Sequence, residues 1–334
     1  VLEGAMATRA RERAFAHRAF GAAEGDQFFA ASCSGCHVRG CDDCHGAGLH
    51  PVGRPSNEAC LRCHNGYSVG WQFEGKAPRE DHERYRRGST SQGEPFLRML
   101  PDVHFERGMT CGDCHPMSSL HEGGRAKGCI DCHPNPAASV PEHSIAAHLT
   151  GMECVACHGA WAPQEYGTFL IRARRDDQKE AFSVVRTWGE WRKSSHLKRQ
   201  DAPPLGVNRA GRVAPIRPHY ILFATDTPRE WENRLLAAEW RAFAPHTVRR
   251  GTVPCGGCHD SPRRFILEPP EDRLYRLEED GFPLRSWWDR EQQTVINGSF
   301  MPVDRHVKMN RKTPEYARQV VRQWQTILGP DVRR

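Results

Sequence analysis

The chain has 334 residues, with 47 basic and 41 acidic side chains that give a formal net charge of +6. Hydrophobic residues make up 38% of the chain and charged residues 26%, and no apolar run approaches the ~18 residues of a membrane-spanning helix. These values exclude disordered, collagen-like and membrane-spanning proteins, and the length allows one to three domains. The 14 cysteines are the most informative feature of the composition.

The 14 cysteines form seven C-x-x-C pairs, and a histidine follows each pair directly. We number these motifs 1 to 7 in chain order, with the cysteine pairs Cys33 and Cys36, Cys41 and Cys44, Cys60 and Cys63, Cys111 and Cys114, Cys129 and Cys132, Cys154 and Cys157, and Cys255 and Cys258. The histidines that close the motifs are His37, His45, His64, His115, His133, His158 and His259. Histidine accounts for 18 of 334 residues. Seven such histidines would therefore arise by chance with a probability on the order of 10⁻⁹.

C-x-x-C-H is the attachment motif of c-type haem. The two thiols bond to the haem vinyl groups, and the adjacent histidine becomes the proximal ligand of the iron. A zinc ribbon needs no histidine after each C-x-x-C unit, a thioredoxin-like site has a single motif, and a disulfide scaffold has no use for histidine at that position. The sequence therefore predicts seven covalently attached haem c groups.

Covalent haem attachment takes place outside the cytoplasm, so we expect a periplasmic or extracellular protein. The chain begins at Val1 without an apolar leader. We interpret it as the mature form that remains after signal-peptide removal.

Six motifs lie between Cys33 and His158, and the seventh stands alone after a long stretch without a motif. This spacing predicts a haem-dense region over residues 1–160 and a C-terminal region over 161–334 that carries the seventh haem and amphipathic helices. A segment so rich in motifs has few side chains left for an ordinary core. The predicted fold class is therefore mainly α with extensive loops and little β structure, with an array of haems as the core.

Four local signals predict secondary structure outside the motifs. Thr227–Glu230 reads as a capping box with proline at the first helical position, and Trp231, Leu235 and Ala238 would share one face of the helix that follows. A second helix is predicted from Thr313 to the stop at Gly329. An N-terminal helix is expected over residues 6–20, and a hairpin is expected to turn at Asp280-Gly281.

Eleven histidines lie outside the motifs, which is more than seven haems need as second axial ligands. We expect the second ligands to be those that closely precede or follow a motif, together with one on the N-terminal helix and one between motifs 5 and 6: His17, His50, His104, His121, His143, His148 and His246. The other four, His82, His196, His219 and His306, are expected to be bystanders. Met99, Met109, Met117 and Met152 are alternative ligands, which would raise the haem potential. The pairing of ligands with motifs stays open at this point.

With these motifs the chain resembles bacterial multihaem cytochromes c. The stretches LPDVHFERGMTCGDCH and HLTGMECVACHGAWAPQEYGTF carry the likeness, which extends distantly to the layout of octahaem tetrathionate reductases and hydroxylamine oxidoreductases. The resemblance implies a further C-x-x-C-H directly after Gln164. Glu165–Phe169 holds that place with neither cysteine nor histidine, which suggests a lost eighth haem site filled by Tyr166 and Phe169; the alternative is an ordinary loop.

The expected function is electron transfer along seven closely spaced haems with two histidine ligands each. The protein would be a free carrier, a subunit of a respiratory complex or a protomer of an extracellular filament, with redox proteins or neighbouring copies as partners. The alternative is an oxidoreductase that reduces or oxidises small nitrogen or sulfur oxyanions at one haem with an open iron position. Such enzymes often have lysine in place of a proximal histidine. All seven motifs here end in histidine and no other complete catalytic constellation is present, so electron transfer ranks first.

The net charge also depends on the cofactors. Each oxidised haem with its two propionates adds about −1 and each reduced haem about −2, so seven haems make the oxidised protein nearly neutral. The many arginines are then counter-charges for propionates rather than a nucleic-acid or membrane patch.

Overall fold

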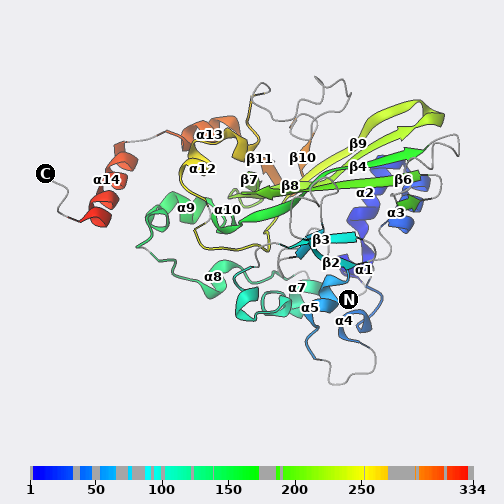
Figure 1. Cartoon of the computed structure of the whole chain (residues 1–334), viewed down its shortest axis with the longest axis horizontal. Coiled ribbons are helices and arrows are strands. Elements are labelled where there is room, and N and C mark those ends of the chain that lie inside the picture. The colour runs from blue at the N-terminus through cyan, green and yellow to red at the C-terminus, as the bar shows by residue number, and fades with distance from the viewer. Residues whose placement is uncertain are drawn as a thin grey trace.

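The computed structural model describes residues 3–32, 38–46, 53–64, 74–76, 87–91, 94–98, 102–121, 124–137, 139–172, 186–188, 191–251, 253–269, 290, 293–311 and 314–329. This part of the chain combines short helices with a large sheet (Figure 1). None of the described helices combines the length and the apolarity that a bilayer crossing requires.

A mixed sheet forms the centre of the molecule, in the order β10-β9-β8-β4-β6-β5. Its strands are β4 (Trp161–Arg172), β5 (Arg186–Trp188), β6 (Trp191–Asp201), β8 (Val213–Asp226), β9 (Trp231–Ala242) and β10 (Thr294–Val295). Strand β4 runs antiparallel to β6 and parallel to β8, and β8 forms an antiparallel pair with β9. Strand β7 (Leu205–Asn208) pairs with both β8 and β11 (Gly298–Phe300). A separate small sheet has the order β1 (Glu74–Lys76), β3 (Glu94–Arg98), β2 (Arg87–Ser91).

This sheet corrects the predicted fold class, because the structure is mixed and the expectation of little β structure is wrong. The helix predicted after Thr227 is also wrong. Thr227–Arg229 makes one 3₁₀ turn (η4), Glu230 is left-handed with φ 55°, and the chain returns as β9 with Trp231 opposite Asp226. A Thr-Pro turn starts a hairpin as readily as a helix, and here the pairing of β9 along β8 outweighs the local helix signal.

The described core consists of side chains from the sheet and from segments packed on it. Trp240, Ile216 and Phe223 form one cluster where β8 meets β9. A second cluster joins the N-terminal helices to β4 and β6. A third joins motif 6 to motif 7 and contains Ala156 and Cys258. These clusters show that the strands bury apolar side chains as sheets normally do.

The predicted N-terminal helix is present as α1 (Ala5–Thr8) and α2 (Ala10–Phe20), separated at Arg9 by a left-handed φ of 47°. Helix α3 (Ala22–Ser32) follows, and α2 and α3 lie against the end of the sheet at the right of Figure 1.

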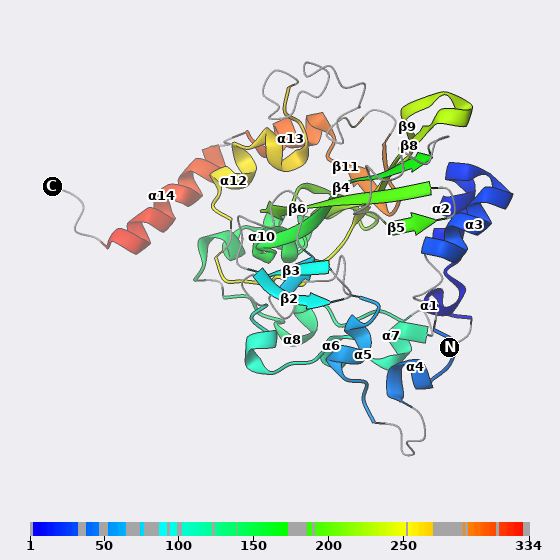
Figure 2. The ribbon, with the colours of Figure 1, turned by 45° about the vertical axis from the view of Figure 1, so that its right-hand side comes forward.

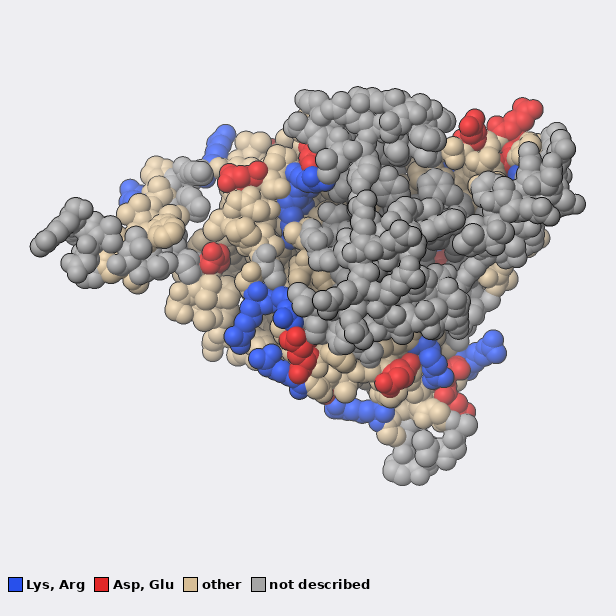
Figure 3. All heavy atoms as spheres, viewed as in Figure 1, with Lys and Arg blue, Asp and Glu red and all other residues tan. Residues whose placement is uncertain are grey.

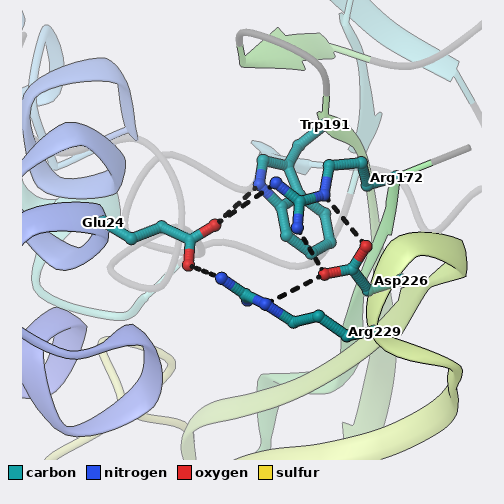
Figure 4. A network of polar contacts seen from close by, with 5 residues as sticks. All are labelled: Glu24, Arg172, Trp191, Asp226 and Arg229. Carbon is teal, nitrogen blue, oxygen red and sulfur yellow. Dashed lines mark hydrogen bonds and ion pairs between the residues drawn. The ribbon is translucent and has the colours of Figure 1, made fainter. Parts of the chain in front are cut away.

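An ion-pair network holds α3 on the sheet (Figure 4). Fully buried Asp226 accepts two hydrogen bonds from Arg172, of 2.9 and 2.6 Å, and lies 3.4 Å from the Arg229 guanidinium. Glu24 of α3 accepts hydrogen bonds from Arg229 at 2.7 Å and from the Trp191 indole at 3.3 Å. Removing one partner would leave a buried charge uncompensated, so the network fixes α3 against the turn between β8 and β9.

Motifs 2 to 7 lie on short helices or directly at their ends: α4 (Asp42–His45), α5 (Asn57–Leu61), α6 (Cys111–Cys114), α8 (Cys129–Cys132), α10 (Val155–His158) and α12 (Gly256–His259). Between them lie α7 (Met117–His121), α9 (Ala146–Gly151), and the 3₁₀ turns η2 (Phe105–Arg107), η3 (Pro141–Ser144) and η5 (Pro262–Phe265). Helices α4, α5, α7 and α8 gather on one side of the sheet, below it in Figures 1 and 2.

The C-terminal helix predicted after Thr313 is confirmed as α14 (Pro314–Leu328), which follows α13 (Val303–Met309) and ends at Gly329 with φ 73°. It projects from the rest of the chain in both views. The hairpin expected at Asp280-Gly281 lies outside the described residues. The division at residue 160 stays a prediction.

Candidate haem sites

Each described motif folds as a single helical turn. In all six of motifs 2 to 7 the histidine N–H donates to the carbonyl of the first cysteine, at 2.8 to 3.0 Å. This i to i−4 bond puts the two sulfurs three residues apart on one face and the imidazole directly after them. The turn can therefore present both thiols to one porphyrin edge and the imidazole to its face, as the motif requires.

Motif 3 differs from the other described motifs in the position of its second cysteine. Helix α5 ends at Leu61, so Cys63 and His64 lie beyond the helix, in a turn closed by bonds from their N–H groups to the Cys60 carbonyl at 3.2 and 2.9 Å. The Cys63 side chain is exposed. The turn around Cys63 therefore lies on the surface of the protein. The role of Cys63 in haem attachment stays a prediction.

The other described cysteines range from exposed to buried. Those with exposed side chains are Cys41, Cys129, Cys132, Cys154 and Cys255. Those with partly buried side chains are Cys44, Cys60, Cys111, Cys114 and Cys157, and Cys258 is buried. The protein chain therefore encloses the attachment positions only in part, and the haem core itself stays a prediction.

An aspartate at the second variable position caps three of the motif turns. Asp113 accepts hydrogen bonds from the Thr110 N–H at 2.7 Å and its hydroxyl at 2.9 Å, and Asp131 accepts from the Gly128 N–H at 2.7 Å. Asp43 accepts in the same way from the Arg39 N–H at 2.5 Å. The backbone bond from Thr110 is the main cause that lowers the pKa of the Asp113 carboxyl. These charged caps satisfy backbone donors that so short a helix leaves open.

Four motif histidines each face a second histidine from a distant segment. The ring centres are 6.3 Å apart for His133 and His104, 6.2 Å for His115 and His246, 6.0 Å for His158 and His143, and 6.1 Å for His259 and His148. Every pair combines one histidine of a motif with one that the sequence favoured as a second ligand. The structure thus brings these partners together, and their role as iron ligands stays a prediction.

This spacing fits an iron atom between the two rings. With about 2 Å between the metal and each nitrogen, and about 1.2 Å from that nitrogen to the ring centre, the centres of two axial imidazoles lie about 6.4 Å apart. Among the described residues, no group of three or more His, Cys, Asp or Glu could hold a bare metal ion. A site with only two protein ligands fits haem iron, because the porphyrin supplies the other four, and does not fit structural zinc.

Hydrogen bonds to Nδ1 set the tautomer of several of these rings. His158 Nδ1 lies 3.0 Å from the Arg249 carbonyl, and His259 Nδ1 lies 3.0 Å from the Met309 carbonyl. His45 Nδ1 lies 2.7 Å from the carbonyl of Gly53. A carbonyl can only accept, so Nδ1 carries a proton and Nε2 is the ring nitrogen suited to bind a metal.

Two of the second histidines, His148 and His104, are oriented in the same way. His148 Nδ1 donates to the Glu142 carbonyl at 3.1 Å. Buried Asp102 accepts from both the N–H and Nδ1 of His104 at 2.8 Å, and its other oxygen accepts from the Val248 N–H at 2.7 Å. Burial lowers the pKa of His148, which favours the neutral imidazole that a metal binds.

Hydrogen bonds join motifs 2 to 5 in chain order. Arg62 of motif 3 donates to the Asp43 carbonyl of motif 2 at 2.6 Å. The Cys111 N–H of motif 4 donates to the Asn57 side chain of α5, the helix in which motif 3 begins, at 2.9 Å. Just before motif 5, the Lys127 N–H donates at 2.8 Å to the carbonyl of Cys114 in motif 4.

Contacts also join motif 5 to motif 6 and motif 6 to motif 7. The thiols of Cys129 in motif 5 and Cys154 in motif 6 are hydrogen-bonded to each other, which raises the pKa of Cys129. Arg264, just after motif 7, donates to the Ala156 carbonyl of motif 6 at 3.0 Å. Motifs 2 to 7 are therefore neighbours in space in the same order as in the sequence.

Of the other favoured ligands, only His17 has a described side chain, and no ring contact joins it to a described motif histidine. His17 forms an ion pair with Asp26 across α2 and α3, at 2.8 Å. His50, and motif 1 with Cys33, Cys36 and His37, lie outside the described residues; so does the side chain of His121 in α7. Within the described side chains, no ring contact joins His45 or His64 to a second histidine.

Of the expected bystanders, His306 is buried and His219 is partly buried. His306 packs on the Phe265 ring at 4.9 Å. His219 stands at a bulge in β8, because Pro218 pairs with Trp240 while Tyr220 pairs with the adjacent Glu239. Burial and nearby arginines lower the pKa of His219 to about 3. No sequence signal distinguished these histidines, since neither lies beside a motif. His82 and the side chain of His196 lie outside the described residues.

The segment Glu165–Phe169 is part of β4 and pairs with β6, and from Thr168 onwards with β8 as well. The alternative of an ordinary loop is therefore wrong. The filling of a lost haem site by Tyr166 and Phe169 concerns side chains that lie outside the described part of the structure.

No protein-family model, curated protein or solved structure matches this chain. The assignment of these sites therefore depends on the motifs, the ring spacing and the hydrogen bonds described above.

Proposed function

We propose that the protein carries electrons outside the cytoplasm along a chain of seven covalently attached haems. The observation that carries this proposal is the set of four histidine pairs, each formed by a motif histidine and a distant one at 6.0 to 6.3 Å. Two imidazoles per iron leave no position for a substrate, which suits outer-sphere electron transfer.

The chain's own residues would hold the haems in three ways. The two cysteines of each motif would fix the porphyrin covalently, and the motif histidine would bind one side of the iron. The second histidine would bind the other side, and for His148 and His104 a carbonyl or carboxylate at Nδ1 would set its orientation. Bound haem supplies an iron that changes oxidation state without making or breaking bonds.

The order of the motifs in space supports the chain of haems. Hydrogen bonds between consecutive motifs keep neighbouring attachment sites adjacent from motif 2 to motif 7. Electron transfer by tunnelling requires such adjacency between successive carriers. The large sheet and its packed core provide a rigid support for the sites, which limits the reorganisation that accompanies each transfer.

We propose redox proteins as partners, either separate carriers, subunits of a respiratory complex or copies of this chain in a filament. On the described surface in Figure 3, Lys and Arg alternate with Asp and Glu along the lower edge. Such mixed charge is unlike the single-sign patch that nucleic-acid binding uses.

The proposal is tested by intact mass and electron paramagnetic resonance of the oxidised protein. We expect a mass excess of seven haems and low-spin ferric signals only. A high-spin signal that shifts with nitrite, hydroxylamine or sulfite would instead support the oxidoreductase. The open haem would then belong to motif 1, 2 or 3, since the histidines of motifs 4 to 7 are paired.

A further inference from the structure

Arg264 is a buried cation between motifs 6 and 7. It lies in η5, directly after motif 7, and its side chain is 5% exposed. One nitrogen, Nη2, donates to the Ala156 carbonyl at 3.0 Å. Its Nε and Nη1 are buried and make no hydrogen bond within the described part of the chain. Arginine stays charged in proteins, so a full positive charge is held here with two donors unused.

The nearest ionisable groups belong to the two motifs. Cys258 of motif 7 and Cys157 of motif 6 are the groups that act most strongly on the guanidinium. Once both thiols are bonded to haem they are thioethers, which cannot ionise and so cannot compensate the charge of Arg264. The apolar side chains of Phe265 and Met301 belong to the same cluster as Cys258. A cation in such surroundings is costly unless a negative group compensates it.

The haems at motifs 6 and 7 would supply that negative charge. An oxidised haem with its propionates carries about −1 and a reduced one about −2. A fixed positive charge nearby therefore stabilises the reduced form more than the oxidised form. A cation at Arg264 therefore raises the reduction potential of a nearby haem.

Glu142 provides the opposite charge at the same two motifs. Its carboxylate lies 3.7 Å from the Cys255 sulfur of motif 7, and its charge also acts on Cys157 of motif 6. The backbone carbonyl of Glu142 orients His148, the proposed second ligand at motif 7. A fixed negative charge at this place disfavours the reduced form.

We propose that Arg264 raises, and Glu142 lowers, the reduction potentials of the haems at motifs 6 and 7. These two residues then set how strongly electrons are held at this end of the array. The inference rests on the proposed function, because it requires haems at both motifs.

The experiment is a spectroelectrochemical titration of the holoprotein, compared with Arg264→Gln, Arg264→Lys and Glu142→Gln. The matched control is Arg263→Gln, because Arg263 is the neighbouring arginine but is exposed and paired with Glu268 at 3.3 Å. We expect Arg264→Gln to move two of the seven components to lower potential and Glu142→Gln to move components upward. Arg264→Lys keeps the charge and should stay close to the wild type, as should Arg263→Gln.

Unchanged potentials in Arg264→Gln with all seven haems loaded would overturn the inference, as would an equal shift in Arg263→Gln. If Arg264→Gln does not fold, the other two variants test the inference. It is overturned if Glu142→Gln raises no reduction potential. It is also overturned if Arg264→Lys, which keeps the charge, lowers the potentials of two components. A wild-type protein with fewer than seven haems would instead contradict the proposed function, and intact mass distinguishes the two failures.

Discussion

Replacing His246 by leucine is the most direct test of the histidine pairs. His246 is partly buried and faces His115 of motif 4 with ring centres 6.2 Å apart. Leucine fills a similar volume but cannot bind iron. We therefore expect one haem of the seven to lose its second axial ligand, so that about one seventh of the ferric iron changes from low spin to high spin.

The same substitution should weaken the fold, because an iron held by both histidines links segments far apart in the sequence. The loop that this link closes has about 130 residues. For a loop of this length, the chain entropy of the unfolded state predicts that the link adds about 5 kcal/mol to the free energy of unfolding. This value is an upper bound if the native segments hold their places without the iron. Removal of the link should lower the midpoint of thermal unfolding, measured by visible absorption and by circular dichroism.

His306→Leu is the matched control, since His306 is also shielded from solvent, at 6% exposure, and packs on Phe265 rather than on a motif histidine. It should leave the spin state of all seven haems unchanged. If His246→Leu kept seven low-spin haems and the wild-type unfolding midpoint, the pairing of His246 with His115 through an iron would be refuted.

Three further substitutions test other parts of the structure. Cys258→Ser removes one of two thioether bonds at motif 7, and we expect that haem to be lost from a fraction of molecules when the protein is denatured in acid, as measured by intact mass. Asp226→Asn should lower the free energy of unfolding by about 3 kcal/mol, because the largely buried guanidinium of Arg172 loses its charged partner; denaturant titration measures this. Asp113→Ala removes the cap of motif 4 and should lower the denaturant midpoint in the same titration, by less than Asp226→Asn does; an unchanged midpoint would show that the cap is dispensable.

The motifs were predictable because their geometry is local. Two cysteines and a histidine within five residues fit one helical turn, and the bond from the His115 N–H to the Cys111 carbonyl at 2.9 Å has its equivalent in every described motif. Helix α14 was predictable for a related reason, since its cap, its spacing of apolar residues and its terminal glycine all lie within one segment.

The exposure of the motif cysteines was not predictable in this way. Cys63 is exposed and Cys258 is buried, although both are the second cysteine of the same five-residue pattern. The difference comes from what packs on each turn: Cys258 belongs to an apolar cluster with Phe265 and Met301, whereas Cys63 lies in a surface turn after α5.

The sheet was not predictable from local signals either. Trp231–Ala242 follows a turn that resembles a helix start, and only its pairing along β8 makes it a strand. Strand formation depends on partners that are distant in the sequence, so a local pattern misjudges it. The composition also favours haem as the core, and it does not reveal the side-chain core that Trp240 and its neighbours form.

The sequence by itself determined the number and position of the C-x-x-C-H motifs and a set of histidines near them, because each motif is a property of one turn of chain. The tertiary structure alone decided that His104 faces His133, that His246 faces His115, and that a cation is buried at Arg264. The reason is physical: an axial pair or a buried charge is defined by side chains that only folding brings within a few ångströms of each other.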